Sequence, residues 1–240
     1  MAGSLSPVLF GAAYAGRYAY DLIDEPSYDA AFSRVAAYGG FNVTAPFKMD
    51  AFRALSEMGC VPEDGGTGCV NTVVHRPDGR FEAYNTDIDG VVGALQGVPA
   101  GTALVVGAGG AAMAARSALL RLGCRPVVAA RREEAILAVL PEGARRGEDY
   151  MLLSDLPCDG FASDIVVYTL PGSAPVPEGL PLEGAVVLEA EYKKPRLATF
   201  PCRRYISGRR WLFHQAVTAY RHFTGEEPDV AAMESAIARV

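Results

Sequence analysis

A short apolar run that ends in a glycine-rich turn constrains the fold of this chain more than any other feature. The run is Ala103–Val106, and it leads into Gly107-Ala108-Gly109-Gly110 and then into an alanine-rich segment that reaches about Leu122. A continuous apolar run of this length is typical of a parallel strand buried on both faces. The alanine-rich segment is typical of a helix. The sequence therefore predicts a buried strand, a tight turn and a helix.

The spacing of small residues in this turn favours a dinucleotide site. Gly107, Gly109 and Ala112 form the pattern G-x-G-x-x-A at the start of the predicted helix. The first glycine permits the tight turn, the second lets a pyrophosphate approach the backbone, and the small third residue lets helix and strand pack closely. The free N–H groups of a helix start also attract phosphate. The alternative is a turn that serves close packing alone.

Two arginines at the end of the next strand bear on the choice of dinucleotide. Arg131 and Arg132 follow the predicted strand Pro126–Ala130, where an NAD site usually has an acidic residue. Guanidinium groups bind a phosphate with charge-assisted and often bidentate hydrogen bonds. The pair therefore favours the 2′-phosphate of NADP. The alternative is a solvated cationic surface paired with Glu133 and Glu134.

The remaining turn, linker and helix-start signals predict an α/β protein in two parts. Gly97–Gly101 is the best candidate for a linker. The chain after it alternates strands with helices, which implies a parallel sheet with helices on both faces. The chain before it predicts a hairpin around Pro77-Asp78-Gly79 and a strand at Tyr18–Ile23. Helices are expected from Ser6-Pro7, from about Lys48 and from about Thr86, and two more near the C-terminus.

Composition excludes several classes of protein. Half of the 240 residues are hydrophobic and the formal charge is −6, so the chain can fill a core and lacks the basic surface of a nucleic-acid or anionic-membrane binder. Its five cysteines contain no C-x-x-C pair, and its three histidines have no metal-ligand spacing. Odd, scattered thiols favour a reduced cytoplasmic protein without a metal site. No uncharged stretch is suited to a membrane span. A signal peptide has a positive charge before its apolar stretch, and the first apolar stretch of this chain has none before it.

The N-terminal half carries polar residues at positions where local rules do not require them. Lys48 falls in the first turn of a predicted helix, where a cation opposes the helix dipole. Asp87 begins another helix, and capping alone explains an acid there. Asn42, Thr44 and Asn71 lie at the ends of predicted strands, where ligands gather in open α/β sheets. For each of the three residues by itself, a role in a turn or a helix cap is as good an explanation as ligand binding.

Taken together, these segments resemble the shikimate dehydrogenase family over nearly the whole chain. The N-V-T-x-P-x-K and N-T-D segments are far more specific than the glycine turn. The matching segments, in chain order, are Ser4-Leu5-Ser6-Pro7, Asn42–Lys48, Gly68–Thr72, Tyr84–Asp87 with Gly90, Gly107–Ala111, Tyr192 with Pro195, Gly208 through Leu212 to Gln215-Ala216, and Thr224-Gly225.

The resemblance implies an NADP-dependent oxidoreductase that interconverts 3-dehydroshikimate and shikimate in aromatic amino-acid biosynthesis. It implies an α/β substrate domain formed by residues 1–96 and completed by helices in 212–240, and a Rossmann-type doubly wound domain in 97–211. Lys48 and Asp87 would be the catalytic pair. The substrate pocket would be lined by Ser4, Ser6, Thr44, Asn71, Tyr192 and Gln215. The cofactor would be bound by Gly107, Ala108, Gly109, Gly110, Ala111, Arg131, Arg132 and Gly208. We expect a small-molecule enzyme that is a monomer or a homodimer.

The sequence departs from the family pattern mainly in the second half. Ala130 stands where the family often has asparagine, Tyr168–Gly172 replaces an asparagine-led loop, and Glu189 replaces a usual aspartate. One extra residue separates Tyr192 from Pro195, and Trp211 replaces a usual methionine. At the start, Gly3 replaces a histidine and only three residues precede Ser4, so the family's first strand is not expected here; either the true start lies upstream or the strand is lost.

Two other functions stay open at this point. One is a family paralogue that oxidises quinate or another hydroxylated cyclohexane carboxylate, with NAD as a possible cofactor; the serines Ser4 and Ser6 and the two arginines count against it. The other is a catalytically silent module that binds shikimate. The altered loops and the unexpected start favour a silent module, whereas the retained Lys48 and Asp87 oppose it.

Overall fold

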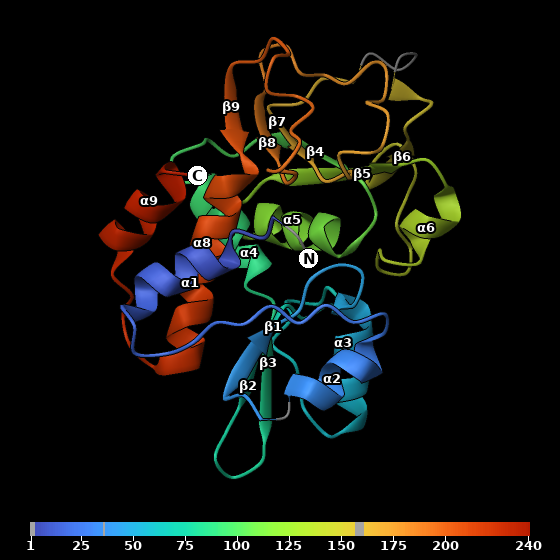
Figure 1. Ribbon diagram of the computed structural model, residues 1–240. Helices are drawn as coiled ribbons and strands as arrows, with labels where there is room; N and C mark the ends of the chain where they lie inside the picture. The colour runs from blue at the N-terminus through green and yellow to red at the C-terminus, as the bar shows by residue number, and fades with distance from the viewer. Residues whose placement is uncertain (1–2, 36, 157–160) are drawn as a thin grey trace. The chain divides into compact units, whose positions relative to one another are not determined.

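The computed structural model describes residues 3–35, 37–156 and 161–240, and its elements are labelled in Figure 1. Contacts divide the chain into two units, one formed by residues up to Gly90 together with Leu212–Val240, the other by Val91–Trp211. The first division lies inside a helix, a few residues before the expected limit of 96/97. The domain limits expected from the sequence therefore stay a prediction.

The first unit is organised around a small antiparallel sheet. Its strands are β1 (Gly40–Asn42), β2 (Thr72–His75) and β3 (Phe81–Tyr84), in the order β1-β2-β3. The expected hairpin is confirmed: Arg76 N donates to Arg80 O at 2.8 Å across the turn between β2 and β3. The antiparallel pairing brings the segment after β1, the segment before β2 and the segment after β3 together at one end of the strands. The polar residues of the predicted site lie in these segments.

Helices α2 (Tyr28–Val35) and α3 (Lys48–Glu57) pack on this sheet through a shared apolar cluster. Ala51 and Leu55 of α3 are fully buried in it. Because these positions are four residues apart, they lie on one face of the helix. Their burial orients α3, and with it the residue at its first position. Helix α4 (Asp87–Ala94) begins directly after β3, at the same edge of the sheet.

A second cluster of the first unit joins the two ends of the chain. Helices α1 (Ser6–Tyr14), α8 (Gly208–Thr224) and α9 (Val230–Ala238) bury Leu9 and Phe10 against Phe213, Tyr220 and Met233. The carboxylate of Asp229 caps α9 by accepting a hydrogen bond from Ala232 N at 2.9 Å. The C-terminal helices therefore pack with the N-terminal helix, as the family resemblance implied.

The expected strand at Tyr18–Ile23 is wrong, because this segment is irregular in the structure. The chain reverses at Ala15 and Gly16, both with positive φ, directly after α1. Tyr20 then stacks on Phe10 with ring centroids 4.6 Å apart. Tyr20 thus packs against the helical cluster, and no strand of the described residues pairs with the backbone of this segment.

The second unit is built on a six-stranded sheet in which every neighbouring pair is parallel. The order is β6-β5-β4-β7-β8-β9, which is the strand order 3-2-1-4-5-6 of dinucleotide-binding sheets. The parallel sheet predicted from the sequence is thereby confirmed, whereas β6 and β9 were not predicted. The strands are β4 (Thr102–Val106), β5 (Arg125–Ala130), β6 (Tyr150–Leu152), β7 (Ile165–Tyr168), β8 (Val186–Glu189) and β9 (Arg204–Ser207).

Small side chains set the packing of this sheet with its first helix. Helix α5 (Gly110–Arg121) buries Ala112, Ala114, Ala115 and Ala118, so its backbone can lie close to β4 and β5. The short helix α6 (Glu133–Leu137) follows β5 and contacts β5 and β6. Another apolar cluster of the sheet is completed by loop residues, among them Leu182 and Leu197.

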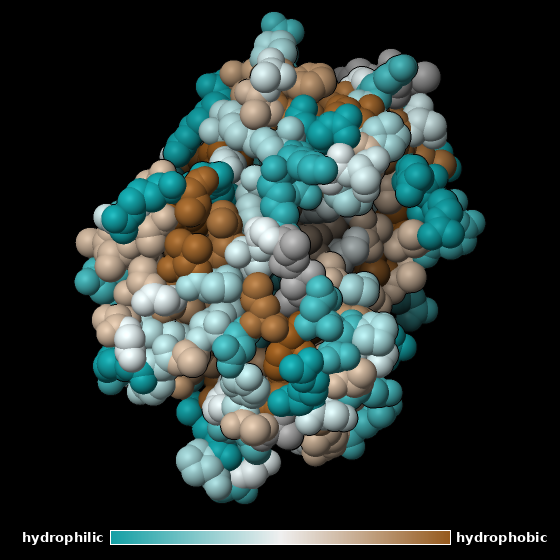
Figure 2. All heavy atoms as spheres, in the orientation of Figure 1, coloured by the Kyte–Doolittle hydropathy of each residue, from teal (hydrophilic) through white to brown (hydrophobic). Residues whose placement is uncertain are grey.

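The outer surface carries few large apolar side chains. Figure 2 shows a face that is mainly hydrophilic with separate apolar patches, and the most exposed of the apolar side chains is Val61, at 88%. In the part of the chain that the structure describes, no helix combines the length and the apolar character needed to cross a lipid bilayer. The described residues also contain no group of three or more histidine, cysteine or acidic side chains placed to hold a metal ion.

Candidate active site

Lys48 and Asp87 form an ion pair between the first residues of two helices. Nζ of Lys48 donates to Oδ2 of Asp87, and the two side chains are only 17% and 12% exposed. The backbone around Lys48 is fixed because Val70 N donates to its carbonyl oxygen at 3.1 Å. A charged pair shielded in this way interacts more strongly than one at the surface. The two residues named together by the family resemblance are thus in direct contact, and their catalytic role stays a prediction.

A buried polar network lies directly beside this pair along the chain. Oδ1 of Asn71 accepts hydrogen bonds from Thr86 N at 2.8 Å and from Thr86 Oγ1 and Thr72 Oγ1, both at 3.1 Å. Nδ2 of Asn71 donates to Oε1 of Gln215 at 3.3 Å. All four residues are buried. Since Thr86 precedes Asp87, the network fixes the backbone that presents the Asp87 carboxylate to Lys48.

Asn42 at the end of β1 extends this network. Its Nδ2 donates to Asn71 O at 3.1 Å and to Thr72 Oγ1 at 3.0 Å, while its Oδ1 accepts from the hydroxyl of Tyr20 at 3.0 Å. Asn42 therefore ties β1 to the strand that follows Asn71. The roles of Thr72 and Thr86 were missed from the sequence. Their position next to Asn71 and Asp87, in the matching segments Gly68–Thr72 and Tyr84–Asp87, was the available signal.

A tight turn before β2 supports the site from the other side. The carboxylate of Asp64 accepts from Gly66 N at 3.2 Å and Gly68 N at 2.5 Å, and Thr67 Oγ1 accepts from Asn85 Nδ2 at 2.8 Å. The turn thereby holds both the segment that leads to Asn71 and the residue before Thr86. These contacts explain why a buried acid at Asp64 is stable without a cationic partner: it is solvated by backbone N–H groups.

Three further predicted substrate residues lie in the same unit. Ser4 and Ser6 are half-buried at the start of α1, where Ser6 N donates to Ser4 Oγ at 3.4 Å. Thr44 is exposed, and its carbonyl oxygen accepts from Phe47 N at 3.0 Å in the turn before Lys48. In the described structure, no hydrogen bond joins any of the three to the Lys48–Asp87 pair. Their roles toward a substrate stay predictions.

In the second unit, the glycine turn has the geometry that a pyrophosphate requires. Gly107 has φ +122°, and a Cβ there would lie 2.3 Å from Oγ1 of Thr169, so glycine is required on both counts. Gly109 caps α5, and open space surrounds the position of a Cβ on it. The first N–H groups of α5, which begin at Gly110 and Ala111, have no partners within the helix. The turn therefore fits the phosphates of a dinucleotide, beside Ala108.

The two arginines after β5 are exposed, and their guanidinium groups form no hydrogen bond or ion pair with any described residue. The alternative, a solvated cationic surface paired with Glu133 and Glu134, agrees with this exposure, but neither ion pair forms among the described residues. Oε1 of Glu133 instead accepts from the hydroxyl of Tyr150 at 2.7 Å and lies 3.9 Å from Nη1 of Arg146. Both guanidinium groups thus remain available for an anion, as the NADP interpretation requires.

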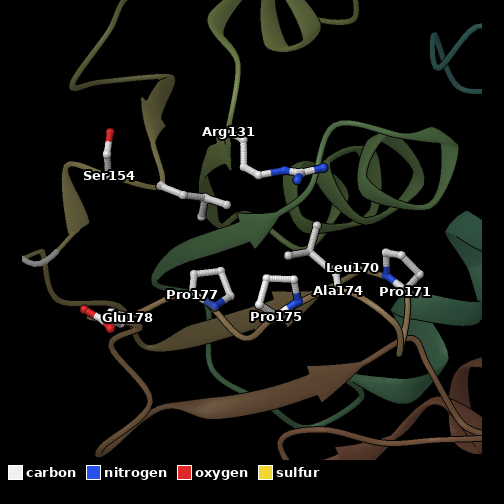
Figure 3. Close-up of a pocket in the computed structure, with 9 residues that line it drawn as sticks. Arg131, Ser154, Leu170, Pro171, Ala174, Pro175, Pro177 and Glu178 are labelled. Carbon is white, nitrogen blue, oxygen red and sulfur yellow. The ribbon is translucent and has the colours of Figure 1, made fainter.

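Arg131 also borders a cavity of about 450 Å³, a volume suited to a small ligand. Figure 3 shows its side chain reaching along one side of the cavity, with Leu170 and a series of prolines opposite. An apolar slot beside a free cation fits a purine ring and an attached phosphate. The sequence analysis did not single out this wall. The residues that line it are Arg131, Leu153, Ser154, Leu170, Pro171, Ala174, Pro175, Pro177 and Glu178.

The last two predicted residues of the second unit follow β8 and β9. A Cβ on Gly208 would lie 2.3 Å from the carbonyl oxygen of Ala190, so close packing of α8 against the chain after β8 already requires glycine there. Tyr192 is in the loop after β8 and is half-buried. Contact of Gly208 with a cofactor and of Tyr192 with a substrate stay predictions.

Fold and site together define a class before any relative is considered. A parallel sheet in the dinucleotide-binding order, a glycine turn and two free arginines belong to one unit, and a buried lysine–aspartate pair belongs to the other. This combination defines a dinucleotide-binding α/β protein with a separate polar site.

Comparison with known proteins gives the family. Shikimate dehydrogenase (NADP(+)) of Archaeoglobus fulgidus is 33% identical over 98% of this chain and 94% of its own length, and that of Rubrobacter xylanophilus is 34% identical over 98% and 91%. Shikimate 5-dehydrogenase from Thermus thermophilus, solved in complex with NADP(H) and shikimate, superposes with a TM-score of 0.76 at 28% identity, covering 98% of this chain and 94% of that one. No family model matches the chain. The chain belongs to the shikimate dehydrogenase family.

Proposed function

We propose that this protein catalyses the reversible, NADP-dependent reduction of 3-dehydroshikimate to shikimate. The observation that carries the proposal is the shielded Lys48–Asp87 pair beside the buried amides of Asn71 and Gln215. Relatives at 33% and 34% identity carry the name shikimate dehydrogenase (NADP(+)), which supports the same reaction here. Shikimate and 3-dehydroshikimate are therefore the proposed small-molecule substrates.

The residues present fit NADP. The turn Gly107–Ala111 would hold the pyrophosphate, Arg131 and Arg132 would bind the 2′-phosphate, and the cavity beside Arg131 would take the adenosine. When bound, NADPH supplies the hydride that reduces the ketone. Among the described residues, neither arginine has a carboxylate partner, which favours NADP over NAD because such a partner would repel the 2′-phosphate.

Lys48 would supply the proton that the new alkoxide needs. Its Nζ carries protons that can pass to a substrate oxygen, and Oδ2 of Asp87 holds Nζ in one place. In the reverse direction the same nitrogen takes up the proton as the alcohol is oxidised. Asp87 can also accept a hydrogen bond from a neighbouring substrate hydroxyl. The pair therefore couples proton transfer to orientation of the ring.

The side-chain amides of Asn71 and Gln215 are proposed to recognise the substrate hydroxyls by hydrogen bonds. Oε1 of Gln215 lies 3.3 Å from both Asn71 Nδ2 and Thr86 Oγ1, so its Nε2 is left to donate to a ligand oxygen. Rigid, buried donors of this kind discriminate strongly against a ligand that lacks the matching group. Ser4, Ser6 and Thr44 of the same unit are proposed to bind the carboxylate and the remaining hydroxyls.

The proposal places the enzyme in the cytoplasm, as a monomer or a homodimer. Support for a reducing compartment comes from the thiols: the cysteines that the structure describes, Cys60, Cys69, Cys124 and Cys202, are all free. Burial raises the pKa of the Cys60 and Cys69 thiols, which keeps them protonated and unreactive. Cys158, the fifth cysteine, lies outside the described residues.

The test is the appearance of NADPH absorbance when the purified protein receives shikimate and NADP. Parallel reactions contain quinate and NAD, and a Lys48→Ala variant serves as the control. NADPH production from shikimate that is lost in the variant supports the proposal. Faster turnover with quinate and NAD would assign the chain to the paralogue. Binding of shikimate without any turnover would identify a silent module and overturn the proposal.

A further inference from the structure

One loop builds most of the wall of the cavity beside Arg131. Leu170, Pro171, Ala174, Pro175 and Pro177 all come from the segment that follows β7, and Figure 3 shows them along one side of the cavity. This segment has no regular secondary structure between Thr169 and Pro177 beyond isolated turns. Its shape must therefore be set by contacts with other parts of the unit.

The first half of the wall is held by the loop that follows β8. Nη1 of Arg196 donates to the carbonyl oxygens of Gly172 at 2.7 Å and Ala174 at 3.1 Å. From the same loop, Oε2 of Glu191 accepts from Gly172 N at 3.4 Å. The two loops are also in close contact, because a Cβ on Gly172 would lie 3.1 Å from Lys194 O. The turn 171–174 is thus bonded through both its N–H and its carbonyl groups.

Arg196 is itself anchored by a fully buried carboxylate. Glu189, at 0% exposure, accepts hydrogen bonds from Arg196 N at 2.6 Å, Leu197 N at 3.1 Å and the hydroxyl of Tyr205 at 2.7 Å. Burial together with Glu189 raises the pKa of Tyr205, so its hydroxyl keeps the proton that it donates. A buried carboxylate with three donors is satisfied and rigid. The backbone of Arg196 therefore has little freedom to move.

We propose that Arg196 is a positioning residue for the cofactor: it fixes the turn 171–174 so that the adenosine pocket is formed before NADP binds. The inference rests on the proposed function, because it assigns the cavity to the adenosine of NADP. A pocket wall that is ordered in advance removes the cost of ordering it on binding. Without Arg196, binding would have to order this proline-rich segment, and affinity would fall.

The same network encloses the predicted substrate residue Tyr192. Tyr192 lies between Ala190 and Arg196, in the loop whose end is fastened to Glu189. Loss of the Arg196 side chain is therefore expected to loosen both the cofactor wall and the loop that presents Tyr192. Loss of Arg131, which holds no part of either loop, is expected to weaken NADP binding alone.

The test measures binding by calorimetry with the full chain. The ligands are NADP, adenosine 2′,5′-bisphosphate, which lacks the nicotinamide half, and shikimate. The variant Arg196→Met keeps the length of the side chain and removes its donors, while Arg196→Lys keeps the charge. Arg203→Met is the matched control, because Arg203 is exposed in the same unit and its side chain forms no hydrogen bond or ion pair with a described residue. Thermal denaturation of each variant is recorded in parallel.

We expect Arg196→Met to lower the affinity for adenosine 2′,5′-bisphosphate about tenfold, which is the effect that loss of a charge-assisted hydrogen bond produces. Arg196→Lys should recover part of that loss, and Arg203→Met should stay within about twofold of the unmodified protein. If Arg196→Met does not fold, Arg196→Lys alone must still show a weaker affinity.

A lower melting temperature with unchanged affinity for the bisphosphate would show a merely structural residue and overturn the inference. This outcome is distinct from failure of the proposed function, which would appear as absence of NADP binding in the unmodified protein. An affinity loss in Arg203→Met as large as that in Arg196→Met would also overturn the inference, since a general charge effect would explain both.

Discussion

The two units of this protein satisfy their polar groups in opposite ways. In the first unit, the amides and hydroxyls of Asn71, Thr86 and Gln215 bond to one another inside the protein. In the second unit, the guanidinium groups of Arg131 and Arg132 have no partner among the described residues, and Arg131 borders an open cavity. The site proposed for the small substrate is thus already complete as a network, whereas the site proposed for the cofactor leaves its charges unpaired.

This difference follows from the ligands that each site would bind. A small polyhydroxylated ring offers many hydrogen-bonding groups and little apolar area, so it is distinguished by donors and acceptors held at fixed positions. A dinucleotide offers phosphates, which a cation recognises with less geometric demand. We infer that changes in the first unit affect folding and turnover together, and changes in the second affect mainly cofactor affinity.

Removing the proposed proton donor is the largest expected effect. Lys48→Ala should lower kcat by at least about a hundredfold with a much smaller change in KM, because general acid catalysis contributes factors of about 10² to 10⁴. Steady-state kinetics with shikimate and NADP measure it. The matched control is Arg53→Ala on the same helix, which breaks an exposed ion pair with Asp50 and should leave kcat unchanged. An undiminished kcat in Lys48→Ala would refute the proton-transfer role.

Removing the free arginines should act on the cofactor alone. Arg131→Ala and Arg132→Ala are each expected to raise KM for NADP by about tenfold or more, since a hydrogen bond to a charged group contributes about 1.5–3 kcal/mol. KM for NAD should change little, because NAD lacks the 2′-phosphate. The ratio of the two KM values is the measurement. An equal increase in KM for NADP and for NAD would mean that the arginines do not bind the 2′-phosphate.

Breaking the buried hydrogen-bond network should mainly lower the free energy of unfolding. Thr86→Val removes a hydroxyl that lies within hydrogen-bond distance of Asn71, Thr72 and Gln215, and the groups left unsatisfied should lower the free energy of unfolding by about 1–3 kcal/mol. Urea denaturation measures the loss. Thr86→Ser keeps the hydroxyl and is the control. A valine variant as stable as the serine variant would show that the network is not held by this hydroxyl.

The smallest expected effect is a pH dependence of the first unit. His222 stacks on Tyr84 with ring centroids 3.7 Å apart, and burial lowers the pKa of His222 despite the nearby Asp89, Glu63 and Glu82. As pH falls below about 6.5, the unfolded chain takes up this proton before the folded chain does, so stability decreases.

The matched variant for this effect is His222→Phe, which keeps a ring on Tyr84 and cannot titrate. Its melting temperature should fall less steeply than that of the unmodified protein between about pH 7 and about pH 5. Melting curves across this range measure the difference. Parallel curves for the two proteins would show that His222 does not contribute to the acid sensitivity.

Local signals in the sequence were sufficient where one segment determines its own structure. The buried strand and glycine turn at Ala103–Gly110, the hairpin at Pro77–Gly79 and the helix that starts at Lys48 all form as expected, because turn chemistry and apolar periodicity act over a few residues. The specific N-V-T-x-P-x-K and N-T-D segments also gave the family before any comparison. The strand expected at Tyr18–Ile23 is wrong, and the aromatic side chains of that segment pack instead on Phe10 and Tyr14 of α1.

The sequence by itself thus determined the fold class, the family and the residue types of both sites. The family resemblance grouped Lys48 with Asp87 and Asn71 with Gln215, but only the tertiary structure decided their hydrogen bonds and brought Arg196 to the turn 171–174. It also decided that Glu133 bonds to Tyr150 and leaves the arginines free. The physical reason is that hydrogen bonds and ion pairs depend on distances of a few ångströms, which are set by how strands and helices pack and not by spacing along the chain.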